Sequence, residues 1–167
     1  MPPQEIVNPE PTSAASPAVT ASLEAQVVSG GSWFYWVAAL SLINSIMLAS
    51  GSDRSFVIGL GLTQAIDLIA AAIGGTAIRV LGFVVNLGVA GLFASFGYFA
   101  VRRRGWAFVV GMIVYLGDGV LYVLVGDWLS VAFHAYVLFS VYSGFSAHRK
   151  LKAVAAMNFL PPGIVAG

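Results

Sequence analysis

Residues 106–147 read WAFVVGMIVYLGDGVLYVLVGDWLSVAFHAYVLFSVYSGFSA, and this stretch decides the fold. It holds two apolar runs that are separated by Gly126 and Asp127. Each run has close to the roughly 20 residues that an α-helix needs to cross about 30 Å of hydrocarbon. A turn this short forces two helices to lie antiparallel. The stretch therefore predicts a transmembrane helical hairpin.

The composition of the whole chain agrees with a membrane location. Hydrophobic residues make up 59% of the 167 residues, charged residues make up 9%, and the mean hydropathy is +0.89. Such a chain has too little polar surface to coat a soluble globule. It also has no cysteine, which excludes disulfides, thiolate nucleophiles, iron–sulfur ligation and cysteine-based zinc sites.

Three more apolar segments precede the hairpin. All five are close to membrane-spanning length and lie near residues 33–50, 55–73, 77–101, 106–125 and 128–147. Their connections are short, so we expect consecutive helices to be antiparallel neighbours. We predict an all-α integral membrane protein, an up-and-down bundle of five transmembrane helices over residues 32–150. Residues 1–31, rich in Pro, Ser, Ala and Thr, are predicted to form a disordered extracytoplasmic tail, and residues 151–167 a short cytoplasmic or interfacial tail.

The basic residues predict the orientation, because Lys and Arg are retained on the cytoplasmic side. If the turn Arg102-Arg103-Arg104 is cytoplasmic, alternation of the five spans also places inside Arg54, Arg149, Lys150 and Lys152. Seven of the eight basic residues then agree, and Arg79 alone lies in the outer half. We expect a multi-pass protein with its N-terminus outside and its C-terminus in the cytoplasm.

Three ionisable residues interrupt the apolar segments and are the best candidates for a functional site: Asp67, Asp118 and His134. A charge at bilayer depth is costly, so such residues usually face a protein interior, a partner or a water-filled cavity. At about 1.5 Å of rise per residue, all three lie on the order of 10 Å below the outer surface. Four further polar residues extend this set toward the midplane or share its helical faces: Gln64, Asn86, Asn44 and Tyr115. Together they predict a polar cavity that opens toward the outside.

The same residues also fit a purely structural interpretation. Asp67 is close enough in depth to Arg79, across the Gly74-Gly75 turn, to form a structural ion pair. Asp118 and His134 match in depth on their hairpin and can form a hydrogen-bonded pair, either as a static link between helices or as a proton-handling unit. Small residues share the polar faces, and close helix packing in lipid requires such residues too.

Sharper chemistries lack support in the sequence. No close-spaced ligand motif accompanies the three ionisable residues, so we predict no metal site. A bis-His haem would need a second intramembrane histidine, and His148 falls in the basic cytoplasmic end. Ser130 lies one helical turn before His134, but the chain has no GxSxG elbow. We predict neither a cofactor nor an enzymatic activity.

The segments SWFYWVAALSLINS, RRRGWAFVVGMIVYLGDG and GDWLSVAFHAYVLFSVYSGF resemble, across most of residues 32–150, a group of small uncharacterised prokaryotic multi-span membrane proteins. The shared features are the Trp-rich start of the first span, a carboxylate in the fourth, and the stretch Asp127-Trp128-Leu129 with Phe133-His134-Ala135 that opens the fifth. The resemblance implies that the span block is one unit in a prokaryotic cytoplasmic (inner) membrane. It brings no catalytic or binding residue with it.

Two classes of function remain open. The first is an accessory or scaffolding subunit of a membrane assembly, whose polar residues fasten helices and whose small-residue faces dock a larger complex. The alternative is a small transporter or channel that binds a proton, a cation or a small polar solute in an outward-facing polar cavity. The expected partners are the lipid bilayer and either further copies of the chain or a larger membrane complex, and not nucleic acid.

Overall fold

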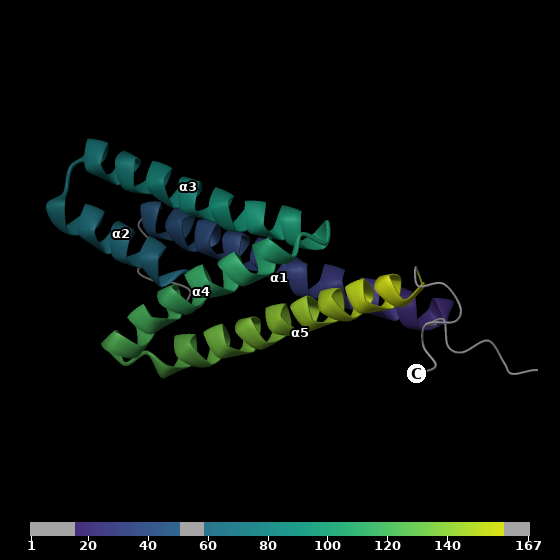
Figure 1. The fold of residues 1–167 in the computed structure, drawn as a ribbon. Coiled ribbons are helices and arrows are strands. Elements are labelled where there is room, and N and C mark those ends of the chain that lie inside the picture. The colour runs from purple at the N-terminus through teal and green to yellow at the C-terminus, as the bar shows by residue number, and fades with distance from the viewer. Residues whose placement is uncertain (1–15, 51–58, 159–167) are drawn as a thin grey trace, which may run out of the picture.

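The structure is a computed structural model that describes residues 16–50 and 59–158. Within these residues every regular element is an α-helix and no strand occurs, which confirms the predicted all-α fold. The helices are α1 (Pro17–Ala49), α2 (Gly61–Ile73), α3 (Thr76–Val101), α4 (Gly105–Val125) and α5 (Trp128–Asn158) (Figure 1). Arg54, the first residues of the second predicted span and the outer parts of both predicted tails lie outside the described residues.

Helix α1 begins at Pro17, about four turns before the first predicted span. The Ser16 hydroxyl accepts the Val19 N–H at 3.4 Å, and proline is favoured at the first helical position. Leu23 and Val27 lie on one face of the helix and are buried. The prediction of disorder is therefore wrong for residues 17–31, because packing against the rest of the bundle orders a segment whose composition alone does not indicate a helix.

Helices α1 and α2 run in the same direction, although an up-and-down bundle would make them antiparallel. The Leu60 N–H donates to Ser41 Oγ (3.0 Å), and further along both helices the Ser45 hydroxyl donates to Asp67 (2.9 Å). Helix α2 thus starts about two turns before the end of α1, beside the middle of α4 (Figure 1). Strict alternation is wrong at this connection, because it assumed that α2 begins at the membrane surface.

The described bundle has its first and last helix ends on the same side (Figure 1). Glu24 near the start of α1 forms a 2.8 Å ion pair with Arg103 in the α3–α4 turn, and Gly30 lies directly against Gly144 of α5. The start of α1 and the end of α5 thus lie at the same end of the described bundle, whereas five strictly alternating spans would place them at opposite ends. The reason is again α2, which does not reverse the direction of the chain relative to α1.

Three helices are long and apolar enough to cross a membrane: α3, α4 and α5, the last over Trp128–Met157. Helix α2 has 13 residues, or about 20 Å of rise, which is too short for about 30 Å of hydrocarbon. Length and composition therefore support three membrane-spanning helices rather than the five expected. Helix α5 also continues to Asn158, into the predicted C-terminal tail.

The core is an aromatic cluster where α1, α3 and α4 meet. Phe34 of α1 packs against Phe93 and Phe96 of α3, with ring centroids 6.4 and 5.9 Å apart. Its ring also lies over Gly111 of α4, where any side chain would collide with it. Phe93 also packs against Tyr115 of α4, with ring centroids 6.0 Å apart. Tyr115 lies between this cluster and the buried polar groups, because it also stacks on His134.

Candidate functional site

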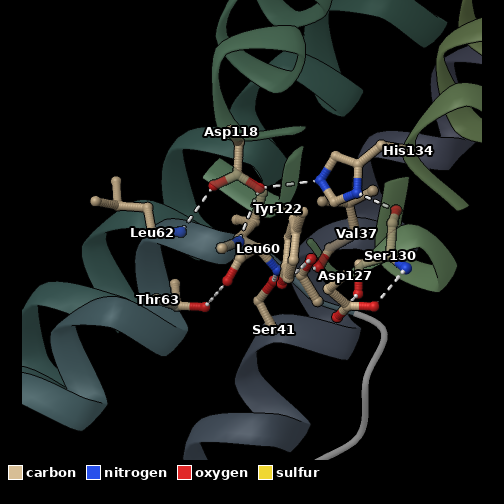
Figure 2. Close-up of polar contacts among 12 residues, drawn as sticks. Val37, Ser41, Leu60, Leu62, Thr63, Asp118, Tyr122, Asp127, Ser130 and His134 are labelled. Atoms are coloured by element: carbon tan, nitrogen blue, oxygen red, sulfur yellow. Dashed lines mark hydrogen bonds and ion pairs between the residues drawn. The ribbon is translucent and has the colours of Figure 1, made fainter. Parts of the chain in front are cut away.

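The carboxylate of Asp118, on α4, caps the start of α2. Its two oxygens accept the backbone N–H groups of Gly61 and Leu62, both at 2.8 Å (Figure 2). The first N–H groups of a helix have no partner within the helix, and they favour a negative charge. Leu60, the residue before α2, has no polar side chain to serve as a cap. A side chain 57 positions away from Gly61 therefore supplies the cap that the local sequence lacks.

His134, on α5, is the third partner of Asp118. Its Nε2 lies 3.0 Å from Asp118 Oδ2, and its Nδ1 lies 2.8 Å from the Ser130 carbonyl oxygen. A carbonyl oxygen only accepts, so Nδ1 carries a hydrogen, and a second proton lies between Nε2 and the carboxylate. The same carboxylate accepts the Gly61 and Leu62 N–H groups, so Asp118 is hydrogen-bonded to α2 and α5 at once. The hydrogen-bonded pair that the hairpin allowed is thus present.

Aromatic rings enclose this pair. The Tyr115 ring stacks on the His134 ring with centroids 4.3 Å apart and an interplanar angle of 13°. The Tyr122 ring is tilted against the imidazole, with ring centroids 5.0 Å apart, and its hydroxyl donates to the Gly59 carbonyl oxygen (3.2 Å). The side chains of Asp118 and His134 are 5% and 4% exposed. The pair is therefore buried, and the two aromatic rings shield it from solvent.

Asp67 belongs to a different cluster, on the seam between α1, α2 and α3. One carboxylate oxygen accepts the Ser45 hydroxyl (2.9 Å), and the other accepts Asn86 Nδ2 (2.7 Å). The same Asn86 amide group lies 2.9 Å from Ser45 Oγ and 3.3 Å from the Thr63 carbonyl oxygen. Asn86 is buried, with 1% of its surface exposed, whereas Asp67 is half-buried.

The predicted single polar cavity is thus two separate clusters. One unites Asp118, His134 and Tyr115, and the other unites Asp67 and Asn86. Asn44 is buried, and it lies with the half-buried Gln64 beside Gly59, at the start of α2.

The predicted ion pair between Asp67 and Arg79 does not form. Arg79 is exposed, and the two oxygens of Asp67 are occupied by Ser45 and Asn86. The physical reason is the register of α3 against α2. Gly82 of α3 packs against Ala70, so Arg79 lies a further turn toward the end of the bundle, beyond the level of Asp67.

Sequence reasoning missed the hydroxyl groups of α1. Ser41 accepts the Leu60 N–H, and Ser45 bonds both Asp67 and Asn86. These serines are one helical turn apart, flanking Asn44, on an otherwise apolar segment. That spacing was the available signal for a polar face on α1.

Asp127 caps α5 in the α4–α5 turn. Its carboxylate accepts the Ser130 hydroxyl (2.7 Å) and the Ser130 N–H (3.2 Å), and these hydrogen bonds lower the pKa of the Asp127 carboxyl below its usual value. Ser130 therefore donates its hydroxyl to Asp127, while His134 contacts only its carbonyl oxygen. These contacts hold the first turn of α5 in place, which agrees with a structural role for Asp127 and Ser130.

No protein family, curated protein or solved structure matches this chain. The resemblance to small prokaryotic membrane proteins consequently stays a prediction.

Proposed function

We propose that the chain is an accessory subunit of a membrane assembly in a prokaryotic cytoplasmic membrane. In this proposal α1, which has 33 residues and packs along α3 and α5, crosses the bilayer together with the three apolar helices α3, α4 and α5, and α2 enters it only partway. The turn Arg102-Arg103-Arg104 and the basic residues of α5 lie at one end of the bundle, and this end is cytoplasmic by the positive-inside rule. Both ends of the described bundle are then cytoplasmic.

The observation that carries the proposal is an uncovered small-residue stripe on α3. Gly88, Gly91 and Ser95 follow helical spacing and are exposed, and a Cβ at either glycine would meet nothing within 4 Å. Ser95 bonds the Gly91 carbonyl oxygen of its own helix (2.8 Å). A glycine inside a helix costs about 1 kcal/mol relative to alanine, and these two contribute no close packing within the described bundle.

This stripe leads into a groove of about 460 Å³ between α1 and α3. The groove is lined by Tyr35, Ala94, Ser95, Tyr98 and Phe99. Small residues spaced three and four apart let helix backbones approach closely in lipid. We assign the stripe and groove to a transmembrane helix of a partner subunit, because a lipid chain does not require glycine at the contact.

The alternative, a transporter that uses one outward-open cavity, lacks the geometry it needs. That function requires Asp67, Asp118 and His134 to share a cavity, and they lie in two clusters. Asp118 and His134 have their hydrogen-bonding groups occupied by the start of α2, by each other and by the Ser130 carbonyl. These contacts support a role in fastening helices.

The test is the size of the native assembly in membranes of the source organism, measured by blue native electrophoresis and native mass spectrometry. We expect wild type to migrate in a complex and the Gly88→Leu/Gly91→Leu double variant to be released from it, with an unchanged melting temperature. Gly117→Leu, at another open helical glycine on α4, is the matched control and should stay assembled. A wild-type protein that is monomeric, or a double variant that remains in the complex, would reject the proposal.

A further inference from the structure

We propose that the Asp67 cluster is a binding site for a monovalent alkali cation, with Na⁺ as the probe of choice. The site consists of the Asp67 carboxylate, the Ser45 hydroxyl, the Asn86 side-chain amide and the Thr63 carbonyl oxygen, contributed by α1, α2 and α3. This proposal goes beyond the accessory function, and it uses no residue of the α3 stripe.

The cluster has more acceptors than hydrogens. Three oxygen atoms lie within 2.7–3.3 Å of Asn86 Nδ2, namely Ser45 Oγ, Asp67 Oδ1 and the Thr63 carbonyl oxygen, while an amide nitrogen carries only two hydrogens. The Ser45 hydrogen is already committed to the other Asp67 oxygen. The amide nitrogen is therefore held at the centre of three oxygens, the position that a small cation with oxygen ligands would take.

Asn86 also carries an oxygen that nothing satisfies. Its Oδ1 is buried and has no hydrogen-bond partner, and only 1% of the surface of Asn86 is exposed. An unpaired buried acceptor costs free energy and calls for an explanation. Rotation of the planar amide by half a turn exchanges Nδ2 and Oδ1, which brings this oxygen to face the other three. In the rotated orientation Oδ1 would be a fourth oxygen ligand of the bound cation.

The charge of the site indicates a monovalent cation. Among the described residues the side-chain ion pairs are Glu24–Arg103 and Asp118–His134, so Asp67 has no basic partner. An intramembrane carboxylate without a counter-charge is costly. One monovalent cation makes the site neutral, whereas a divalent ion would leave a net positive charge. No group of three or more His, Cys, Asp or Glu side chains suited to a transition metal occurs in the described residues.

The position of Asp67 provides access. It is half-buried and lies six residues before the end of α2, about 9 Å from the end of the bundle opposite the arginine turn. Asn86 lies deeper and is shielded. A cation would therefore enter from the end of the bundle opposite the arginine turn, contact Asp67 first and reach Asn86 by the amide rotation.

The experiment measures Na⁺ binding to the purified full-length protein in detergent. Thermal unfolding is followed by tryptophan fluorescence, which the four Trp residues allow, in NaCl or choline chloride at constant ionic strength and neutral pH. We expect Na⁺ to raise the melting temperature of wild type by several degrees, because a ligand that binds only the folded state stabilises it. Radioactive ²²Na⁺ binding should approach one ion per chain.

Asp67→Asn keeps the size and most of the hydrogen bonds but removes the charge, so we expect it to fold and to lose both the thermal shift and ²²Na⁺ binding. Asn86→Leu should also lose binding, and Ser95→Ala, outside the site, should behave as wild type.

The proposal is overturned if wild type binds no ²²Na⁺, if Asp67→Asn binds it equally, or if only pH and not Na⁺ moves the melting temperature. The Gly88→Leu/Gly91→Leu variant should still bind Na⁺, which separates this result from the test of the accessory function.

Discussion

At the scale of single residues, Asp118 is the side chain on which the interior depends most. It joins three helices, since it lies on α4, bonds His134 of α5 and accepts the first two N–H groups of α2. The sequence identified Asp118 and His134 as exceptional because charges are rare in apolar segments. It did not identify the role of the carboxylate as a helix cap, because the partners are backbone groups whose position depends on where α2 starts.

Replacement of Asp118 by alanine should therefore destabilise the protein strongly. The change leaves the Gly61 and Leu62 N–H groups and His134 Nε2 without this partner, and each buried polar group left unsatisfied costs about 1–3 kcal/mol. Unfolding in mixed micelles with increasing denaturant measures this free energy. Ser95→Ala is the control, since Ser95 is exposed and bonds only its own helix, and it should change stability by less than about 0.5 kcal/mol. A wild-type stability for Asp118→Ala would show that the start of α2 is held by something else.

At the scale of helices, the contacts between α1 and α5 depend on backbone approach rather than on large side chains. Gly30 and Gly144 face each other, and a Cβ added to Gly144 would lie 2.8 Å from the Gly30 Cα. The obstacle is backbone, which cannot rotate away. This contact holds the middle of α1 against α5.

Gly144→Ala should consequently separate α1 from α5 and destabilise the bundle by about 1–3 kcal/mol, the usual cost of forcing atoms into a packed interface. The matched substitution is Gly88→Ala, on the open face of α3, where the higher helix propensity of alanine should leave stability unchanged or raise it by up to about 1 kcal/mol. Melting temperatures of the two variants, purified in the same detergent, make the comparison. Equal destabilisation by both would contradict the assigned helix contact.

At the scale of the whole molecule, the direction of α2 decides the topology. Five antiparallel spans place the chain ends on opposite sides, whereas a half-length helix parallel to α1 places the described ends on the same side. In the proposed function, the positive-inside rule places both described ends in the cytoplasm, together with the arginine turn.

Single cysteines test this topology without background, because the chain has no cysteine of its own. We expect Ala21→Cys and Ala153→Cys, both exposed at the arginine end, to be protected from a membrane-impermeant maleimide in intact cells and labelled after lysis. Thr76→Cys, exposed at the opposite end, should be labelled in intact cells. Labelling of Ala21→Cys and protection of Ala153→Cys in intact cells would instead restore the opposite-sided topology.

The sequence by itself determined the features that depend on local composition. Apolar length predicted the helical class, and glycines and charged turns placed the described limits of α3, α4 and the start of α5 within one residue of the structure. The rarity of buried charge singled out Asp67, Asp118 and His134. Only the tertiary structure decided that residues 17–31 are helical, that α2 starts inside the bundle and that Asp67 meets Ser45 and Asn86 rather than Arg79. These features depend on contacts between segments distant in the chain, and hydrophobicity and spacing do not encode the direction or rotation of one helix against another.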